Sequence, residues 1–241
     1  MKLTKEEIQF IDDYLFKNDV KFWDVRLELL DHIVLAVEDK IENEGISFNE
    51  ALLEVHRGFG NQLIKRSVHR SEVWTKGLYQ SNIGFKKFTR KKQKELGRKY
   101  RKKTRGFVKQ QLVNPIFLIE YLLFIGLFFM LYKLWPTSTF LTGLIVLMIP
   151  TFFSSYYSIK DKSTRKSLSF SMAISSSMLG WSLYNLGFYI MKEIYESVDA
   201  MPHLVFLIIP CVLYPFLRAS VKLYKEVYLN SKTIYDLKTQ Y

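Results

Sequence analysis

Apolar residues recur at helical spacing through the first sixty positions of the chain. Over residues 20–44 they return every three or four positions, which gathers them on one face of a helix. Thr4 with Glu7, and Ser47 with Glu50, are capping boxes, in which each side chain bonds a free backbone N–H of the other residue. The pattern predicts three helices, one after each capping box and one between them.

This predicted helical module, residues 1–60, is acidic, because it holds seven basic and fourteen acidic side chains. Gly45 follows the second predicted helix and suits the left-handed conformation that ends helices. The third predicted helix runs up to Gly58 and Gly60. We expect a small, soluble, all-α unit.

Four apolar runs follow in the second half of the chain. They are residues 115–135, 138–157, 167–191 and 201–217. Each is about the length needed to cross a hydrocarbon core of ~30 Å. The runs predict a four-helix transmembrane domain over residues 114–218 and a cytoplasmic tail over residues 219–241. Three prolines in the fourth run predict an irregular or kinked helix there.

Basic residues are distributed unevenly between the two sides of these predicted spans. With the N-terminal module in the cytoplasm, the outer loops hold only Lys133 and Lys192, and the other basic residues lie on the inner side. By the positive-inside rule, this asymmetry predicts a multi-pass protein of the cytoplasmic (inner) membrane with both termini in the cytoplasm.

The net charge of the chain is concentrated just before the first apolar run. The formal net charge is +12, and residues 86–109 contain thirteen basic side chains and one acid, Glu95. The other 22 basic and 22 acidic side chains cancel. The thirteen are Lys86, Lys87, Arg90, Lys91, Lys92, Lys94, Arg98, Lys99, Arg101, Lys102, Lys103, Arg105 and Lys109.

Residues 61–113 predict a basic amphipathic linker, helical but broken by glycines, with Phe85 and Tyr100 among the aromatic residues on one face. Such charges can neutralise nucleic-acid phosphates, lipid headgroups or an acidic protein. Because the basic residues end six positions before Pro115, at the expected inner membrane surface, we expect all thirteen to contact anionic headgroups of the bilayer. We expect no nucleic-acid partner.

Glu120 is the one acidic residue inside a predicted span, and an intramembrane carboxylate is a candidate functional group. The alternative is a carboxylate only about 7–8 Å deep that reaches the headgroups or pairs with a nearby Lys, and the shallow position favours this alternative. The third run is rich in small polar residues. In it Ser176 and Gly180 form a small-xxx-small pair, a candidate for close packing within the bundle or between copies of the chain.

Motifs that carry chemistry are not recognisable in the sequence. It contains no phosphate-binding or dinucleotide-binding glycine pattern, no H-E-x-x-H and no recognisable Ser/His/Asp set. One cysteine, Cys211, supplies neither a disulfide framework nor a Cys-based metal cluster. We expect no catalytic, cofactor-binding or metal-binding residues and no enzymatic activity.

The N-terminal module also carries a recognisable pattern. It consists of an E-L-x-x-H core helix at residues 28–32, Gly45, an S-x-x-E-A helix start at residues 47–51 and a terminal F-G at residues 59–60. This pattern resembles the HAAS-like or permease-prefix domains, small helical N-terminal signalling domains of bacterial membrane proteins. The resemblance covers about residues 1–60 and implies a cytoplasmic signalling or docking module.

The sequence therefore predicts an all-α, non-enzymatic signalling or accessory component of the membrane. An unknown protein partner is expected to bind residues 1–60, and a homo-oligomer is possible. The alternative is a transporter or permease subunit in which Glu120 and the Ser-rich third run line a path.

Overall fold

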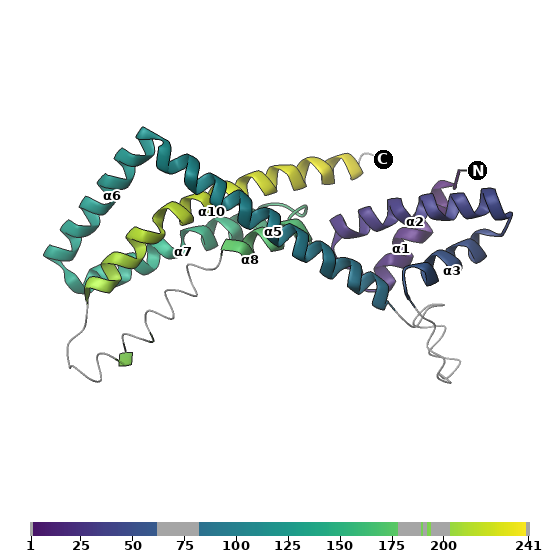
Figure 1. Ribbon diagram of the computed structural model, residues 1–241, viewed down its shortest axis with the longest axis horizontal. Coiled ribbons are helices and arrows are strands. Elements are labelled where there is room, and N and C mark those ends of the chain that lie inside the picture. The colour runs from purple at the N-terminus through teal and green to yellow at the C-terminus, as the bar shows by residue number, and fades with distance from the viewer. Residues whose placement is uncertain (1, 62–81, 178–188, 190–191, 194–202, 240–241) are drawn as a thin grey trace. The chain divides into compact units, whose positions relative to one another are not determined.

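The computed structural model describes residues 2–61, 82–177, 189, 192–193 and 203–239 (Figure 1). Every regular element in these ranges is a helix and none is a strand, as the sequence predicts. The chain divides into two compact units. The first comprises Met1–Glu95 with Lys166–Leu168, and the second comprises Leu96–Arg165 with Ser169–Tyr241.

The first unit contains α1 (Lys5–Lys17), α2 (Trp23–Glu44) and α3 (Phe48–Gly58). Both predicted capping boxes are present, and Gly45 ends α2 in the left-handed conformation. Asp19 has a φ of 69° at the end of α1, a position that more often holds glycine. α2 starts at Trp23, three residues later than the sequence predicts.

The core of the first unit reaches beyond the predicted module. Ile11, Leu29 and Ala51, from the three N-terminal helices, are fully buried. Phe85, near the start of α5 (Ile83–Val113), is also buried, and its ring lies 5.5 Å from the ring of Phe59. The beginning of α5 therefore belongs to this unit, whereas the sequence assigns it to the linker of residues 61–113.

Asn61 and Gly84 attach α5 to the first unit. The side-chain carbonyl oxygen of Asn61 accepts hydrogen bonds from the backbone N–H groups of Gly84, at 2.8 Å, and Phe85, at 3.4 Å. These N–H groups lie in the first turn of α5, where the helix itself supplies no acceptor. A Cβ on Gly84 would lie 1.9 Å from the carbonyl oxygen of Phe59, so only glycine permits this approach.

α5 is one continuous helix of 31 residues. The prediction of a helix broken by glycines is therefore wrong over these residues, because Gly97 and Gly106 both lie inside it. Each glycine costs only about 1 kcal/mol relative to alanine, and the burial of side chains such as Phe85 and Tyr100 outweighs this cost. The earlier part of the predicted linker, residues 62–81, lies outside the described residues.

The second unit contains α6 (Pro115–Leu134), α7 (Pro136–Lys160), α8 (Leu168–Ser177) and α10 (His203–Thr239), together with α5 from Leu96 onward. Among the described residues, three helices are long and apolar enough to cross a membrane, namely α6, α7 and α10. The length and apolar composition of these three helices therefore make the chain a membrane protein. Of the third predicted span, residues 167–191, residues 178–188 and 190–191 lie outside the described ranges, and α8 is its described helix.

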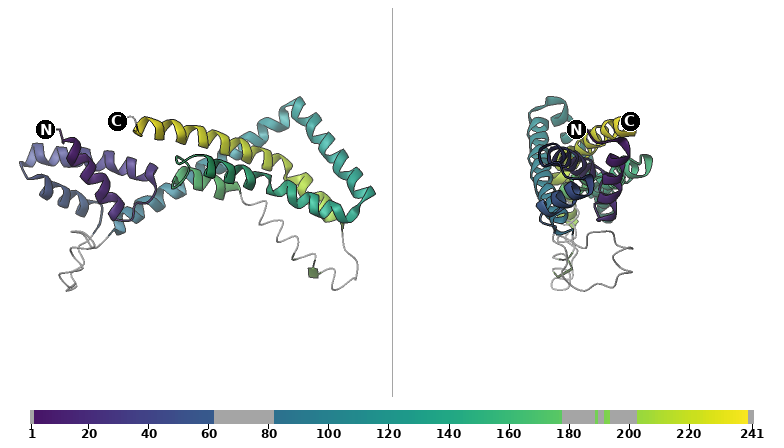
Figure 2. Two further views of the ribbon diagram at one scale, coloured as in Figure 1. Left: turned by 180° about the vertical axis from the view of Figure 1, so that it is seen from behind. Right: turned by 90° about the vertical axis from the view of Figure 1, so that its right-hand side faces the viewer.

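α10 is longer than the fourth predicted span. It continues as one helix through Pro210 and Pro215, so no irregular segment interrupts it, and the alternative of a kink at these prolines stays a prediction. The predicted tail, residues 219–241, is helical as far as Thr239. α10 lies along α7 (Figure 1 and the left view of Figure 2), and Leu147 and Leu217 are buried between the two helices.

A second cluster of buried side chains joins four helices of this unit beyond the apolar part of α10. Tyr100 of α5, Phe170 of α8 and Tyr224 of α10 are each less than one tenth exposed. Tyr157 of α7 packs against the same cluster, and its ring stacks on that of Tyr228 at 4.7 Å. The second half of α5 is therefore part of the packed structure of this unit.

We expect Gly84→Ala to destabilise the first unit. The added Cβ would overlap the Phe59 carbonyl, and overpacking of this kind costs about 1–3 kcal/mol or more. The measurement is amide hydrogen exchange of α1–α3 in the full-length chain in detergent, which should become faster.

Gly106→Ala is the matched control, because nothing lies within 4 Å of the Cβ that it adds. Exchange in α1–α3 should then stay at the wild-type rate. Equal rates in the two variants would contradict the close approach of Gly84 to Phe59.

Candidate functional site

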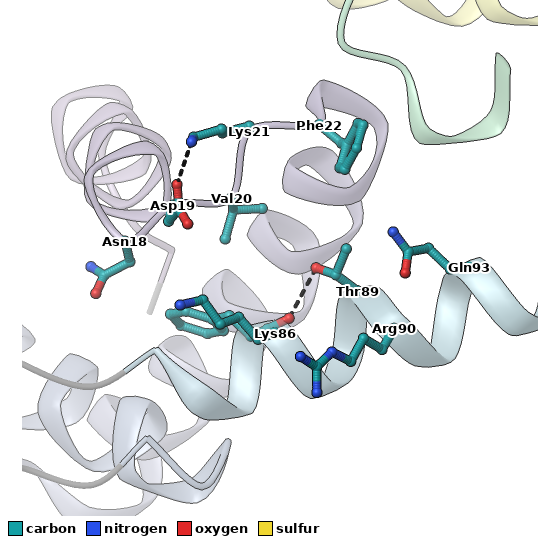
Figure 3. A pocket seen from close by; sticks show the side chains of 10 residues that line it. Asn18, Asp19, Val20, Lys21, Phe22, Lys86, Thr89, Arg90 and Gln93 are labelled. Carbon is teal, nitrogen blue, oxygen red and sulfur yellow. Dashed lines mark hydrogen bonds and ion pairs between the residues drawn. The ribbon is translucent and has the colours of Figure 1, made fainter. Parts of the chain in front are cut away.

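A surface groove opens in the first unit between the α1–α2 loop and the start of α5 (Figure 3). Its volume is about 360 Å³. The lining residues are Asn18, Asp19, Val20, Lys21, Phe22, Phe85, Lys86, Thr89, Arg90 and Gln93. Asp19 pairs with Lys21 at 2.9 Å, and this hydrogen bond holds the pKa of Asp19 below its ordinary value. The one carboxylate of the groove is thus held by a neighbouring cation.

His56 lies in the core of the first unit and is 1% exposed. Its Nδ1 lies within hydrogen-bond distance of the Tyr14 hydroxyl and, at 3.5 Å, of the side-chain amide nitrogen of Asn61. The ring of Phe85 packs against it edge to face, with 5.7 Å between the ring centroids. His56 is therefore a packing residue in the core of the first unit.

Three residues from the loop after α7 belong to the first unit. The carboxylate of Asp24 accepts hydrogen bonds from the Ser167 hydroxyl at 3.1 Å and from the Leu168 backbone N–H at 2.8 Å. The backbone N–H of Trp23 donates to the Lys166 carbonyl at 3.0 Å. Nothing in the sequence indicates this contact, because residues more than 140 positions apart leave no local pattern.

Glu120 of α6 is bound by two side chains of α10. The Tyr214 hydroxyl donates to one carboxylate oxygen at 2.6 Å, and the Arg218 guanidinium donates to the other. Arg218 also lies over the ring of Phe117, 5.0 Å from its centroid. The sequence predicts a nearby Lys as the alternative to a functional carboxylate, and the structure supplies an Arg in that role. Tyr214 and Arg218 are four residues apart on a helix, and this spacing could have identified them as one face.

Tyr121, the residue after Glu120, forms a hydrogen bond with the backbone of α10. Its hydroxyl donates to the carbonyl of Cys211 at 2.9 Å. In a regular helix that carbonyl would accept from residue 215, but Pro215 has no backbone N–H. Tyr121 therefore satisfies the acceptor that the proline leaves open, and an unsatisfied backbone group in apolar surroundings is costly.

Eleven of the thirteen basic residues before the first span are exposed. Lys92 and Lys103 are the two half-buried exceptions. Lys92 pairs with Glu28 at 2.5 Å, and this bond raises the pKa of Lys92. Lys103 pairs with Glu226 of α10. These two lysines therefore act in internal ion pairs, whereas the other eleven remain candidates for contact with headgroups.

The proposed helix-packing pair is described only in part. The hydroxyl of Ser176 donates to the carbonyl of Ala173 at 2.8 Å, within α8. Ala173 itself is fully buried against the cluster around Tyr100. Gly180 lies outside the described residues.

Within the described ranges, no group of three or more His, Cys, Asp or Glu residues could hold a metal ion. Searches against protein-family models, curated proteins and solved structures gave no match for the chain. The resemblance of residues 1–60 to HAAS-like domains therefore stays a prediction.

We expect Tyr121→Phe to weaken the packing of α6 against α10. Loss of the hydrogen bond to the Cys211 carbonyl should lower the free energy of unfolding by about 0.5–1.5 kcal/mol. The measurement is the midpoint of thermal unfolding in detergent, which should fall. Tyr132→Phe is the control in the same helix, since no hydroxyl hydrogen bond of Tyr132 is found among the described residues.

Pro215→Ala separates this explanation from a general packing loss. The alanine N–H can donate to Cys211, so Tyr121→Phe should cost less in the Pro215→Ala background than in the wild-type chain. An equal cost in both backgrounds would contradict the role given to Tyr121.

Proposed function

We propose that the chain is a non-enzymatic signalling or accessory component of the bacterial inner membrane, and that it docks a protein partner through its first helical unit. The uneven distribution of basic residues supports four crossings with both termini in the cytoplasm. The resemblance to HAAS-like domains supports docking as the role of residues 1–60. The second unit supplies the apolar helices that anchor the chain.

One observation carries this proposal. Lys166–Leu168, from the loop between the second and third predicted spans, form part of the same compact unit as α1–α3. Asp24 and Trp23, at the start of α2, hold this segment through hydrogen bonds. A partner that shifts the start of α2 would therefore act directly on the loop that leads into the third predicted span.

The contacts of Glu120 favour docking over transport. A carboxylate that carries an ion or a proton along a path must exchange partners, whereas Glu120 is bound by both Arg218 and the Tyr214 hydroxyl. Removing one member of such a pair leaves an uncompensated charge in apolar surroundings. We therefore assign the pair a role in joining α6 to α10.

The docking proposal is tested with photo-crosslinking residues at Phe10 and Leu35, two exposed apolar positions of the first unit. One protein should crosslink at these sites in cells. When purified, it should bind the full chain in nanodiscs and change the hydrogen exchange of residues 161–168.

Asp24→Ala should leave this binding intact but abolish the change in the loop, because Asp24 holds Ser167 and Leu168. Asp13→Ala is the control, since Asp13 is exposed on α1. The proposal fails if no partner crosslinks, or if a bound partner leaves the loop unchanged in the wild-type chain.

Substitution of the Glu120 pair tests the transport alternative. Glu120→Gln should keep partner binding at the wild-type level. Arg218→Gln should lower the thermal midpoint more than Glu120→Gln/Arg218→Gln does, because the single variant leaves the carboxylate without its cation. If Glu120→Gln abolishes the cellular phenotype without any loss of stability, the transport function replaces the one proposed here.

A further inference from the structure

Most of the exposed basic side chains of α5 fall on a single helix face. At 100° per residue, ten residues between positions 87 and 109 lie within an arc of about 120°, which runs from about 140° to about 260° around the helix from Phe85. Nine of the ten are basic and the tenth is Val108. The nine, here called the basic strip, are Lys87, Arg90, Lys91, Lys94, Arg98, Arg101, Lys102, Arg105 and Lys109.

The charges of the basic strip form no ion pair with the described residues. All nine side chains are exposed. Across the part of the chain that the structure describes, none of them takes part in a side-chain hydrogen bond or ion pair. Lys92 and Lys103, which do form ion pairs, lie on the opposite face near Phe85 and Tyr100. α5 thus separates its internal cations from its external ones.

The basic strip leads directly to a candidate membrane span. From Lys87 to Lys109 it extends for about 33 Å at a rise of 1.5 Å per residue. Asn114 then ends α5, and its side chain caps α6 by accepting a hydrogen bond from Ile116 at 3.0 Å. Val113 and Ile116, on either side of this junction, are exposed apolar residues. One end of the strip is therefore fixed near the depth at which headgroups lie.

We propose that the basic strip binds anionic phospholipid headgroups on the side of the membrane from which α6 enters. The proposal rests on the membrane location given above, and it names the lipid class and the nine side chains that recognise it. Anionic headgroups attract juxtamembrane basic residues with about 1 kcal/mol each, or about fivefold in partition, and the total for nine residues is less than additive.

The positions of the aromatic rings favour lipid over nucleic acid. Proteins that bind single-stranded nucleic acid combine basic side chains with exposed aromatic rings on which the bases stack. In α5 the rings of Phe85 and Tyr100 are buried, and the Phe107 ring faces Lys103 and Lys222 at 5.8 and 4.5 Å. None of these aromatic residues lies on the basic strip. The strip offers charge alone, which suits a headgroup layer.

The test uses the full-length chain in phosphatidylcholine nanodiscs, mixed with sucrose-loaded vesicles that can be pelleted. The chain should partition onto vesicles that contain phosphatidylglycerol and not onto pure phosphatidylcholine vesicles. The partition coefficient should fall as salt is added, because salt screens exposed charges.

Two double variants that remove equal charge give the decisive comparison. Lys87→Gln/Lys94→Gln, two positions near the middle of the arc, should lower the partition coefficient about five- to twenty-fold. Lys86→Gln/Lys99→Gln removes two exposed lysines of the same helix that lie outside the arc, and it should lower the coefficient less than about threefold.

Three results would overturn the proposal. They are equal losses in the two variants, no preference for phosphatidylglycerol, and binding of a single-stranded RNA that depends on the strip while vesicle binding does not. The assay contains no protein partner and starts from a chain already inserted in a bilayer. Failure of lipid binding is therefore distinct from failure of partner docking.

Discussion

The close approach of Gly84 to the Phe59 carbonyl determines how α5 is rotated about its axis. Asn61 holds the first N–H groups of the helix, and the missing side chain at position 84 lets the two backbones come together. Phe85 must then point into the core. Because a helix turns 100° per residue, this buried ring sets the direction of the α5 side chains that follow it within the first unit, up to Glu95. Lys92, seven residues on, returns to the same face and meets Glu28.

In the second unit, α6 and α10 are joined by polar groups in apolar surroundings. Tyr121 donates to the carbonyl that Pro215 leaves open, and Glu120 binds Tyr214 and Arg218. Apolar side chains alone give two lipid-embedded helices little preference for each other, because lipid is equally apolar. These directional bonds therefore define the register of α6 against α10. The ring of Phe124, which stacks on Tyr214 at 4.2 Å, packs beside them.

Local signals in the sequence were sufficient to predict the helices and the apolar runs. The capping box of Thr4 and Glu7 marks a helix start within a stretch of four residues. The single residue Gly45 marks a helix end. The sequence could not supply the contacts that override local preference. Gly97 is unfavourable inside a helix, and α5 nevertheless continues because side chains on both sides of it are buried. α10 continues through Pro215, and the hydroxyl of Tyr121, ninety residues from Cys211, supplies the donor that the proline lacks.

For the candidate sites, too, the sequence identified the residues but not the contacts that they make. Charge counting located the thirteen basic residues and Glu120, but it treated the thirteen as equivalent. Lys92 and Lys103 are eleven residues apart, which is close to three helical turns, so they share one face with the buried aromatic residues. A lysine on that face needs a carboxylate to offset its partial desolvation, and Glu28 and Glu226 supply it. Each pair can be found only after the helices are packed, because its acid lies in a distant part of the chain. The net charge of this segment therefore serves two purposes, internal attachment on one face and an open cationic surface on the other.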